Sequence, residues 1–68
     1  MANINLKTIN TDIFEIFDGN KKIGIINYNH DSGNYDGFTV EDNYNFEGVK
    51  DKKEAINIIV ERCCISKN

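Results

Sequence analysis

Apolar and polar residues alternate with a period of two through much of the first 48 positions, the spacing that half-buried β-strands show. Polar clusters interrupt this alternation. Gly19-Asn20 fits a two-residue hairpin loop, 30–34 forms a longer polar loop, and 41–43 suits a three-residue loop with Asn43 in the left-handed conformation. The pattern predicts antiparallel strands joined by short turns.

These turns determine which residues share a face of the sheet. With a loop at 19–20, Ile16 faces Ile23 and Phe14 faces Ile25. With a loop at 41–43, Val40 faces Tyr44 and Phe38 faces Phe46. Each register brings large apolar residues together. One face is expected to carry Phe14, Ile16, Ile23, Ile25, Phe38, Val40 and Phe46. The other is expected to carry Ile13, Glu15, Phe17, Ile26, Tyr28, Tyr35, Thr39 and Glu47.

The period changes near the C-terminus. Asp51 is a suitable N-cap with Glu54 three positions later, and a helical stripe follows it, made up of Ala55, Ile56, Ile59, Val60 and Cys63. We therefore expect an α+β fold in which residues 1–68 form a single domain. Its parts are a small antiparallel meander of three to four strands over 12–48 and one helix over 51–66, packed on one face of the sheet.

The second sheet face is too apolar and aromatic for a fully solvated surface. Large bare apolar patches are uncommon on monomeric proteins, so something is expected to cover it. Either residues 1–10 fold over it as an arm, or a partner does. The same ten residues could instead add an edge strand.

Charge is distributed unevenly along the 68 residues, whose net charge is −3. No Lys or Arg lies between Ile23 and Val49, whereas this stretch holds five carboxylates, Asp31, Asp36, Glu41, Asp42 and Glu47. Such a stretch repels phosphate, so we expect no direct nucleic-acid binding through it. The five carboxylates could form a binding site for a basic partner, or they could simply form a solvated surface.

The only histidine stands in the sequence His30-Asp31-Ser32. Hydrolytic triads bring their members together from separate elements, and consecutive residues rarely reach productive geometry. The surrounding residues favour a turn, and no nucleophile elbow accompanies them. We therefore predict a loop here, no catalytic residues and no enzymatic activity.

Cys63 and Cys64 are adjacent, cannot close a useful loop and are expected to be reduced thiols. Together with His30 they match no usual zinc spacing. The glycines match neither a dinucleotide fingerprint nor a phosphate-binding loop. We therefore expect no metal site and no cofactor.

No apolar run approaches the roughly 20 residues of a membrane span, and the N-terminus lacks the basic and apolar segments of a signal peptide. We expect no membrane association and a cytoplasmic location.

Three resemblances bear on function. The segments GNYDGF, NFEGV and KKEAINIIV resemble the strand–strand–helix core of HicB-type antitoxins, over about half the chain and without that family's Pro-containing strand. The element order, with KDKKEAI opening the helix, is similar to the AP2-like DNA-binding domain of phage integrases, whose sheet carries basic residues where this one carries acids.

The short, acidic, Asn-rich chain also resembles small phage and mobile-element inhibitors of the anti-CRISPR kind. That resemblance implies a bacterial protein target, such as a CRISPR effector, bound in the cytoplasm of the host. Carboxylates would then replace the phosphates of nucleic acid.

The leading hypothesis is thus a non-enzymatic protein-binding inhibitor encoded by a phage or mobile element. Aromatic residues commonly anchor interfaces and carboxylates steer association. The expected binding residues are Tyr28, Asp31, Tyr35, Asp36, Glu41, Asp42 and Glu47. The alternatives are an antitoxin-like or regulatory module that self-assembles, for example as a homodimer, and a small DNA-binding β-sheet domain.

Overall fold

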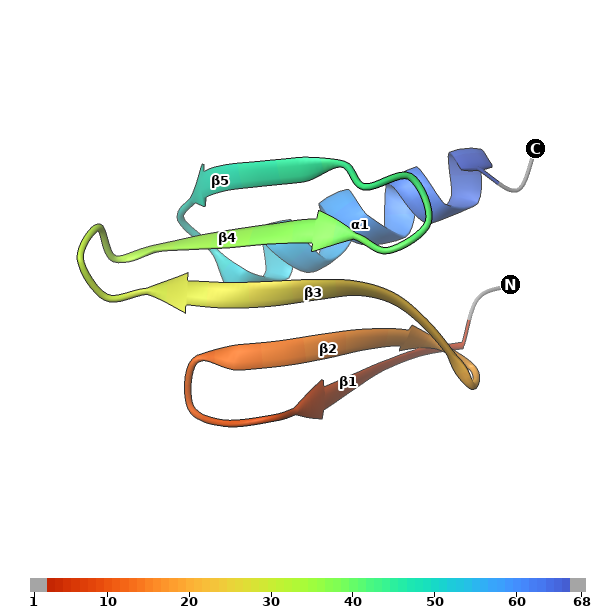
Figure 1. Cartoon of the computed structure of the whole chain (residues 1–68), viewed down its shortest axis with the longest axis horizontal. Coiled ribbons are helices and arrows are strands. Elements are labelled where there is room, and N and C mark those ends of the chain that lie inside the picture. The colour runs from red at the N-terminus through yellow and green to blue at the C-terminus, as the bar shows by residue number, and fades with distance from the viewer. Residues whose placement is uncertain (1–2, 67–68) are drawn as a thin grey trace.

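A five-stranded antiparallel sheet carries one helix in the computed structural model, which describes residues 3–66, with side chains up to Cys63 (Figure 1). The elements in chain order are β1 (Ile4–Thr8), β2 (Ile13–Asp18), β3 (Lys21–Asn29), β4 (Asn34–Thr39), β5 (Asn45–Val49) and α1 (Lys52–Ser66). Each strand pairs with the next one along the chain. The predicted α+β class, antiparallel sheet and C-terminal helix are confirmed, but the sheet has five strands instead of three to four.

The fifth strand comes from the N-terminal segment, for which an arm and an edge strand were the alternatives. Ile4–Thr8 pairs with β2, with Leu6 opposite Ile16. Asn10 reverses the chain, because its side-chain Oδ1 accepts hydrogen bonds from the backbone N–H groups of Asp12 and Ile13 at 2.8 and 2.9 Å. The described part of this segment therefore widens the sheet and leaves its face uncovered. Residues 1 and 2 lie outside the described residues.

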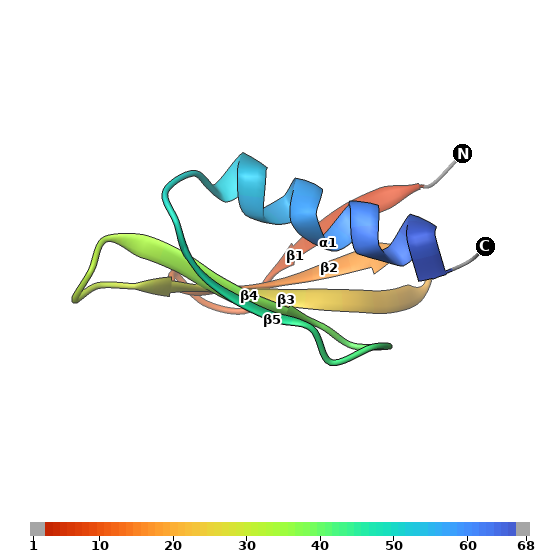
Figure 2. The same ribbon diagram turned by 90° about the horizontal axis from the view of Figure 1, so that it is seen from above.

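Helix α1 begins where the capping pattern predicts. The Asp51 carboxylate accepts a hydrogen bond from the Lys53 backbone N–H at 3.2 Å, and the Asp51 carbonyl accepts one from Ala55 at 3.1 Å. The helix lies over β3, β4 and β5 on one side of the sheet (Figure 2). Among residues 3–66, nothing lies against the opposite side.

A β-bulge at Ile23 corrects the predicted register of the β2–β3 hairpin. The two-residue turn at Gly19-Asn20 is present, and Asp18 faces Lys21. After Phe17 and Lys22, however, the next pair is Ile16 and Gly24, so Ile23 has no partner across the strands. The extra residue reverses the alternation beyond it. The expected pairing of Ile16 with Ile23, and of Phe14 with Ile25, is therefore wrong.

The loop between β4 and β5 produces a second correction. Asn43 has the expected positive φ, 53°, but the loop includes Val40, because the Thr39 backbone N–H donates to the Tyr44 carbonyl. Phe38 consequently faces Asn45, and Phe46 faces Gly37. The expected pairs of Phe38 with Phe46 and of Val40 with Tyr44 are wrong.

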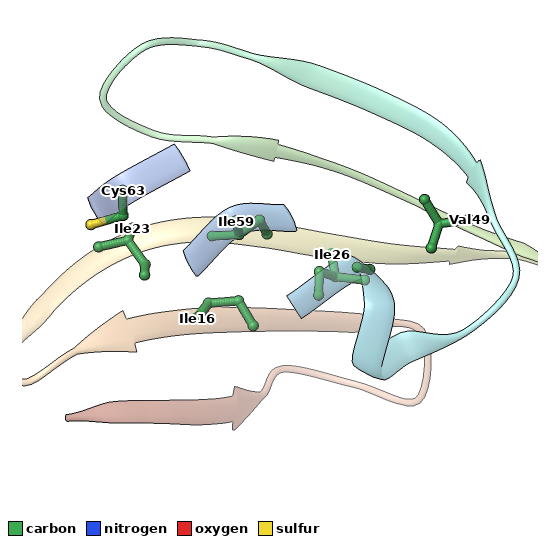
Figure 3. Close-up of a cluster of buried hydrophobic side chains, with 7 residues drawn as sticks. Ile16, Ile23, Ile26, Val49, Ile59 and Cys63 are labelled. Carbon is green, nitrogen blue, oxygen red and sulfur yellow. The ribbon is translucent and has the colours of Figure 1, made fainter. Parts of the chain in front are cut away.

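Together the two shifts exchange residues between the faces. Ile25 and Phe38 lie opposite the helix, Val40 is exposed in the loop, and Ile26, Tyr35 and Thr39 share the face that α1 covers. The core lies between this face and the helix, and its buried apolar residues are Ile16, Ile23, Ile26, Val49, Ala55, Ile59 and Cys63 (Figure 3). Ile23 remains in this core because the bulge places Ile23 and Gly24 on the same side of the sheet.

Gly24 lets the helix approach the sheet closely. A Cβ atom at this position would lie 2.6 Å from Ile59 Cγ2 and 3.0 Å from the Phe38 carbonyl oxygen. We expect Gly24→Ala to lower the free energy of unfolding by about 1–3 kcal/mol through overpacking. Urea denaturation of the single variants and of the pair with Ile59→Ala, which removes both Cγ2 and Cδ1, provides the test. The loss caused by Gly24→Ala should be smaller in the Ile59→Ala background, whereas strictly additive losses would contradict this contact.

Candidate protein-binding face

The sheet face opposite α1, here called the open face, has an apolar centre. Alternation along β2 and β3, with the cross-strand pairs, places Ile13, Phe17, Ile25 and Phe38 on it. All four are half-buried. Sequence reasoning placed Ile13 and Phe17 here and assigned Ile25 and Phe38 to the core.

Asp36 and Glu47 lie at the β4–β5 end of the open face. A second bulge brings them together: Tyr35 faces Val49 and Gly37 faces Phe46, so both Glu47 and Gly48 lie opposite Asp36. Gly48 has a φ of 75°, a conformation that favours glycine.

A shallow hollow of about 290 Å³ lies beside this pair of carboxylates, and a neighbouring one of about 300 Å³ shares them. The first is lined by Ile25, Asn27, Asp36, Gly37, Phe38, Asn45, Phe46 and Glu47. Apolar walls, amide groups and two carboxylates thus meet at one place. A long side chain with a cationic end, such as that of Arg, matches this combination.

The two carboxylates have no cationic partner among the described residues. Like charges opposite each other on neighbouring strands destabilise a sheet. The other end of the open face differs, because Lys22 Nζ lies 3.1 Å from Glu15 Oε2. The open face is therefore close to neutral across β2 and β3 and acidic across β4 and β5.

Two other predicted binding residues, Glu41 and Asp42, have partners within the chain. Glu41, in the β4–β5 loop, forms an ion pair with Lys21 at the start of the neighbouring strand β3. Asp42 accepts hydrogen bonds from Arg62 Nε and Nη2 at 3.1 and 2.8 Å, and another from the hydroxyl of buried Thr39. These contacts tie the β4–β5 loop to the last turns of α1.

The same cluster includes Tyr44. The Arg62 guanidinium lies 3.8 Å from the centre of the Tyr44 ring, and the Tyr44 backbone N–H donates to the Thr39 hydroxyl at 3.1 Å. The hydrogen bonds from Thr39 and Arg62 lower the pKa of Asp42 below its ordinary value of 3.8. This carboxylate therefore holds the loop in place as an anion.

Tyr28, Asp31 and Tyr35 lie near the β3–β4 turn. The two tyrosines face each other across the strands, with ring centres 5.0 Å apart, on the side of the sheet that carries α1. Asp31 is exposed in the turn. The seven predicted residues thus form three groups instead of one surface, and only Asp36 and Glu47 lie on the open face.

The turn predicted at 30–34 is confirmed. Gly33 has a φ of 75°, and its backbone N–H donates to the Asn29 carbonyl at 2.8 Å. His30 Nε2 lies 2.7 Å from Asp12 Oδ1, so the histidine joins this turn to the β1–β2 turn. The Ser32 hydroxyl accepts a hydrogen bond from the Asn34 backbone N–H.

Among the side chains described, those of residues 3–63, the structure brings together no group of three or more His, Cys, Asp or Glu residues able to hold a metal ion. Cys63 is a buried free thiol, and the side chain of Cys64 lies outside the described residues. In the same range, no helix has the length and apolar character needed to cross a membrane.

Comparison of the chain with protein-family models, with curated proteins and with solved structures finds no match.

The lowered pKa of Asp42 predicts a pH-dependent contribution to stability. The unfolded chain binds this proton more tightly than the folded one, so the contribution is fully present above the ordinary pKa of 3.8 and is lost as pH falls through the lower folded value. Asp42→Asn should therefore be less stable than the wild type near neutral pH, and the difference should shrink below about pH 4.

Urea denaturation across pH 2–7 measures this difference. Asp31→Asn is the matched control, because Asp31 has no cationic partner among the described residues. A difference between wild type and Asp42→Asn that stays constant with pH would show that Asp42 does not act through its charge.

Proposed function

We propose that the chain is a non-enzymatic protein-binding inhibitor whose open face docks on a basic, nucleic-acid-handling protein of a bacterial host. The observation that carries the proposal is the pair Asp36 and Glu47, two facing carboxylates with no cationic partner among the described residues, beside the uncovered apolar residues of the same face. The partner's Arg or Lys would enter between them. Encoding by a phage or mobile element, and a CRISPR effector as target, are the parts of the proposal that depend on the resemblance to anti-CRISPR inhibitors.

The apolar part of the open face supports docking of a protein. Ile25 and Phe38 face each other in the middle of the sheet, with Ile13 and Phe17 further along the same side. An uncovered patch of this kind, rimmed by polar groups, is typical of an interaction site. Removing it from water would provide non-directional binding energy.

The charged part supports selection of a basic partner. An incoming cation would relieve the repulsion between Asp36 and Glu47, and the hollow offers apolar walls for its aliphatic stem. Surfaces that bind phosphates are rich in Arg and Lys, so such a surface is complementary to this end of the sheet. Glu41 and Asp42 are engaged inside the chain and contribute less.

The proposal predicts loss of binding when the carboxylates are reversed. Asp36→Lys/Glu47→Lys changes the net charge from −3 to +1, since each substitution adds two charges. Association with a captured target should slow about 10–100-fold at low salt, because electrostatic steering is reversed. Wild type and variant would be immobilised, exposed to nuclease-treated bacterial lysate, and compared by biosensor kinetics on the purified target.

Glu54→Lys/Glu61→Lys is the matched control, with the same net charge on exposed positions of α1. It should keep most of the wild-type affinity. Double-stranded DNA or RNA added to the purified target should compete with the wild-type chain. Equal binding of the target by both double variants would contradict docking of this face on a nucleic-acid site. Binding of the wild-type chain that added nucleic acid does not reduce would contradict it as well.

A further inference from the structure

Strand β1 forms one free edge of the sheet, and its backbone groups alternate in direction. The Asn3 carbonyl accepts from the Gly19 N–H, and the Ile9 N–H donates to the Ile13 carbonyl, both at 2.9 Å and both toward β2. Neighbouring residues of a strand present their N–H and C=O groups to opposite sides. Ile4, Leu6 and Thr8 therefore direct their N–H and C=O groups away from β2.

The side chains beside this edge are also uncovered. Leu6 and Ile9 are 40% and 48% exposed, although they lie on or directly after β1. Helix α1 lies over β3–β5, away from β1 at the far edge of the sheet (Figure 1). Within residues 3–66, the edge thus combines unpaired backbone hydrogen-bonding groups with exposed apolar side chains.

We propose that β1 pairs with β1 of a second copy of this chain, antiparallel and centred on Leu6. In this register Leu6 faces Leu6 of the second copy, Ile4 faces Thr8, and Asn5 faces Lys7. The outward groups of Ile4, Leu6 and Thr8 then form three hydrogen-bonded pairs with six backbone hydrogen bonds, since each such pair exchanges two. All five residues of the strand take part.

The strand is self-complementary in charge as well as in backbone direction. Its only charged residue is Lys7, which would face the neutral Asn5, so no like charges oppose each other. The opposite edge, β5, is less suited, because it carries Glu47 and the Gly48 bulge, two features that discourage edge pairing. A two-fold axis perpendicular to the sheet relates the copies, so their open faces would adjoin.

Hydrogen exchange of the wild-type chain, read by NMR at each amide, tests this pairing directly. In a monomer the Leu6 and Thr8 amides face solvent, while Asn5 and Lys7 are bonded to β2. In the dimer all four are protected. Raising the concentration about 100-fold within the dimeric range should slow Leu6 exchange about tenfold, because the monomer fraction then falls with the square root of concentration. Light scattering should give twice the 7.8 kDa of one chain.

Leu6→Pro removes an outward N–H and leaves the bonds to β2 in place, so it should yield a monomer. Leu6→Ala keeps the N–H and should weaken the dimer less. A monomer at every concentration would overturn the proposal, and so would a dimer whose Leu6 and Thr8 amides exchange freely. The exchange data on the wild-type chain decide this even if Leu6→Pro fails to fold. Asp36→Lys/Glu47→Lys should still form the dimer in light scattering, so pairing through β1 is independent of the proposed function.

Discussion

The bulge at Ile23 is the constraint on which the two faces of the sheet depend. It inserts one residue opposite the Ile16–Phe17 step, and every side chain of β3 after it changes face relative to a regular hairpin. Ile26 thereby enters the core beneath α1, while Ile25 joins the open face. Without the extra residue, the helix would meet Ile25 instead of Ile26.

Gly24 is needed in addition to the bulge, because the helix approaches strand β3 closely at this position. Ile59 lies so close to the strand that a Cβ atom at position 24 would fall within 3 Å of it. Bulge and glycine together seat the helix on β3, and the Asp42–Arg62 ion pair with Thr39 holds its far end to the β4–β5 loop. The helix is fixed to one face at its middle and near its C-terminal end, and the other face receives no cover from residues 3–66 (Figure 2).

This division gives the carboxylates different roles. Glu41 and Asp42 are in contact with Lys21 and Arg62 and stabilise the fold. Asp36 and Glu47 oppose each other without such contacts in the part of the chain that the structure describes, and a basic partner would relieve their repulsion. Some of the carboxylates between Ile23 and Val49 therefore stabilise the fold. The two that remain available for a partner on the open face lie together at its β4–β5 end.

Local signals in the sequence predicted the elements well. The cap at Asp51, the turn at Gly19-Asn20 and the left-handed Asn43 each depend on neighbouring residues only, and all three are confirmed. The faces were not predictable in the same way, because a bulge leaves little local mark and one inserted residue exchanges two sets of apolar side chains. Gly24 and Gly48, within strand patterns, were the available hints.

The site was accordingly predicted only in part. Asp36 and Glu47 were identified from the absence of cations around them, which is a property of the sequence. Tyr28 and Tyr35 lie on the helix side of the sheet, and Phe38 takes the place beside the carboxylates that was predicted for them. Both outcomes depend on the pairing of distant strands. Residue type alone could not reveal it.

The most direct test of this account is the exposure of individual isoleucine methyl groups to a neutral, soluble paramagnetic probe, measured by NMR on the dilute chain. The account predicts strong relaxation of the Ile13 and Ile25 methyls, on the open face, and little relaxation of Ile16 and Ile26, beneath the helix. Relaxation of Ile25 as weak as that of Ile26 would mean that the face is covered or the register is different, and the proposed binding face would be lost.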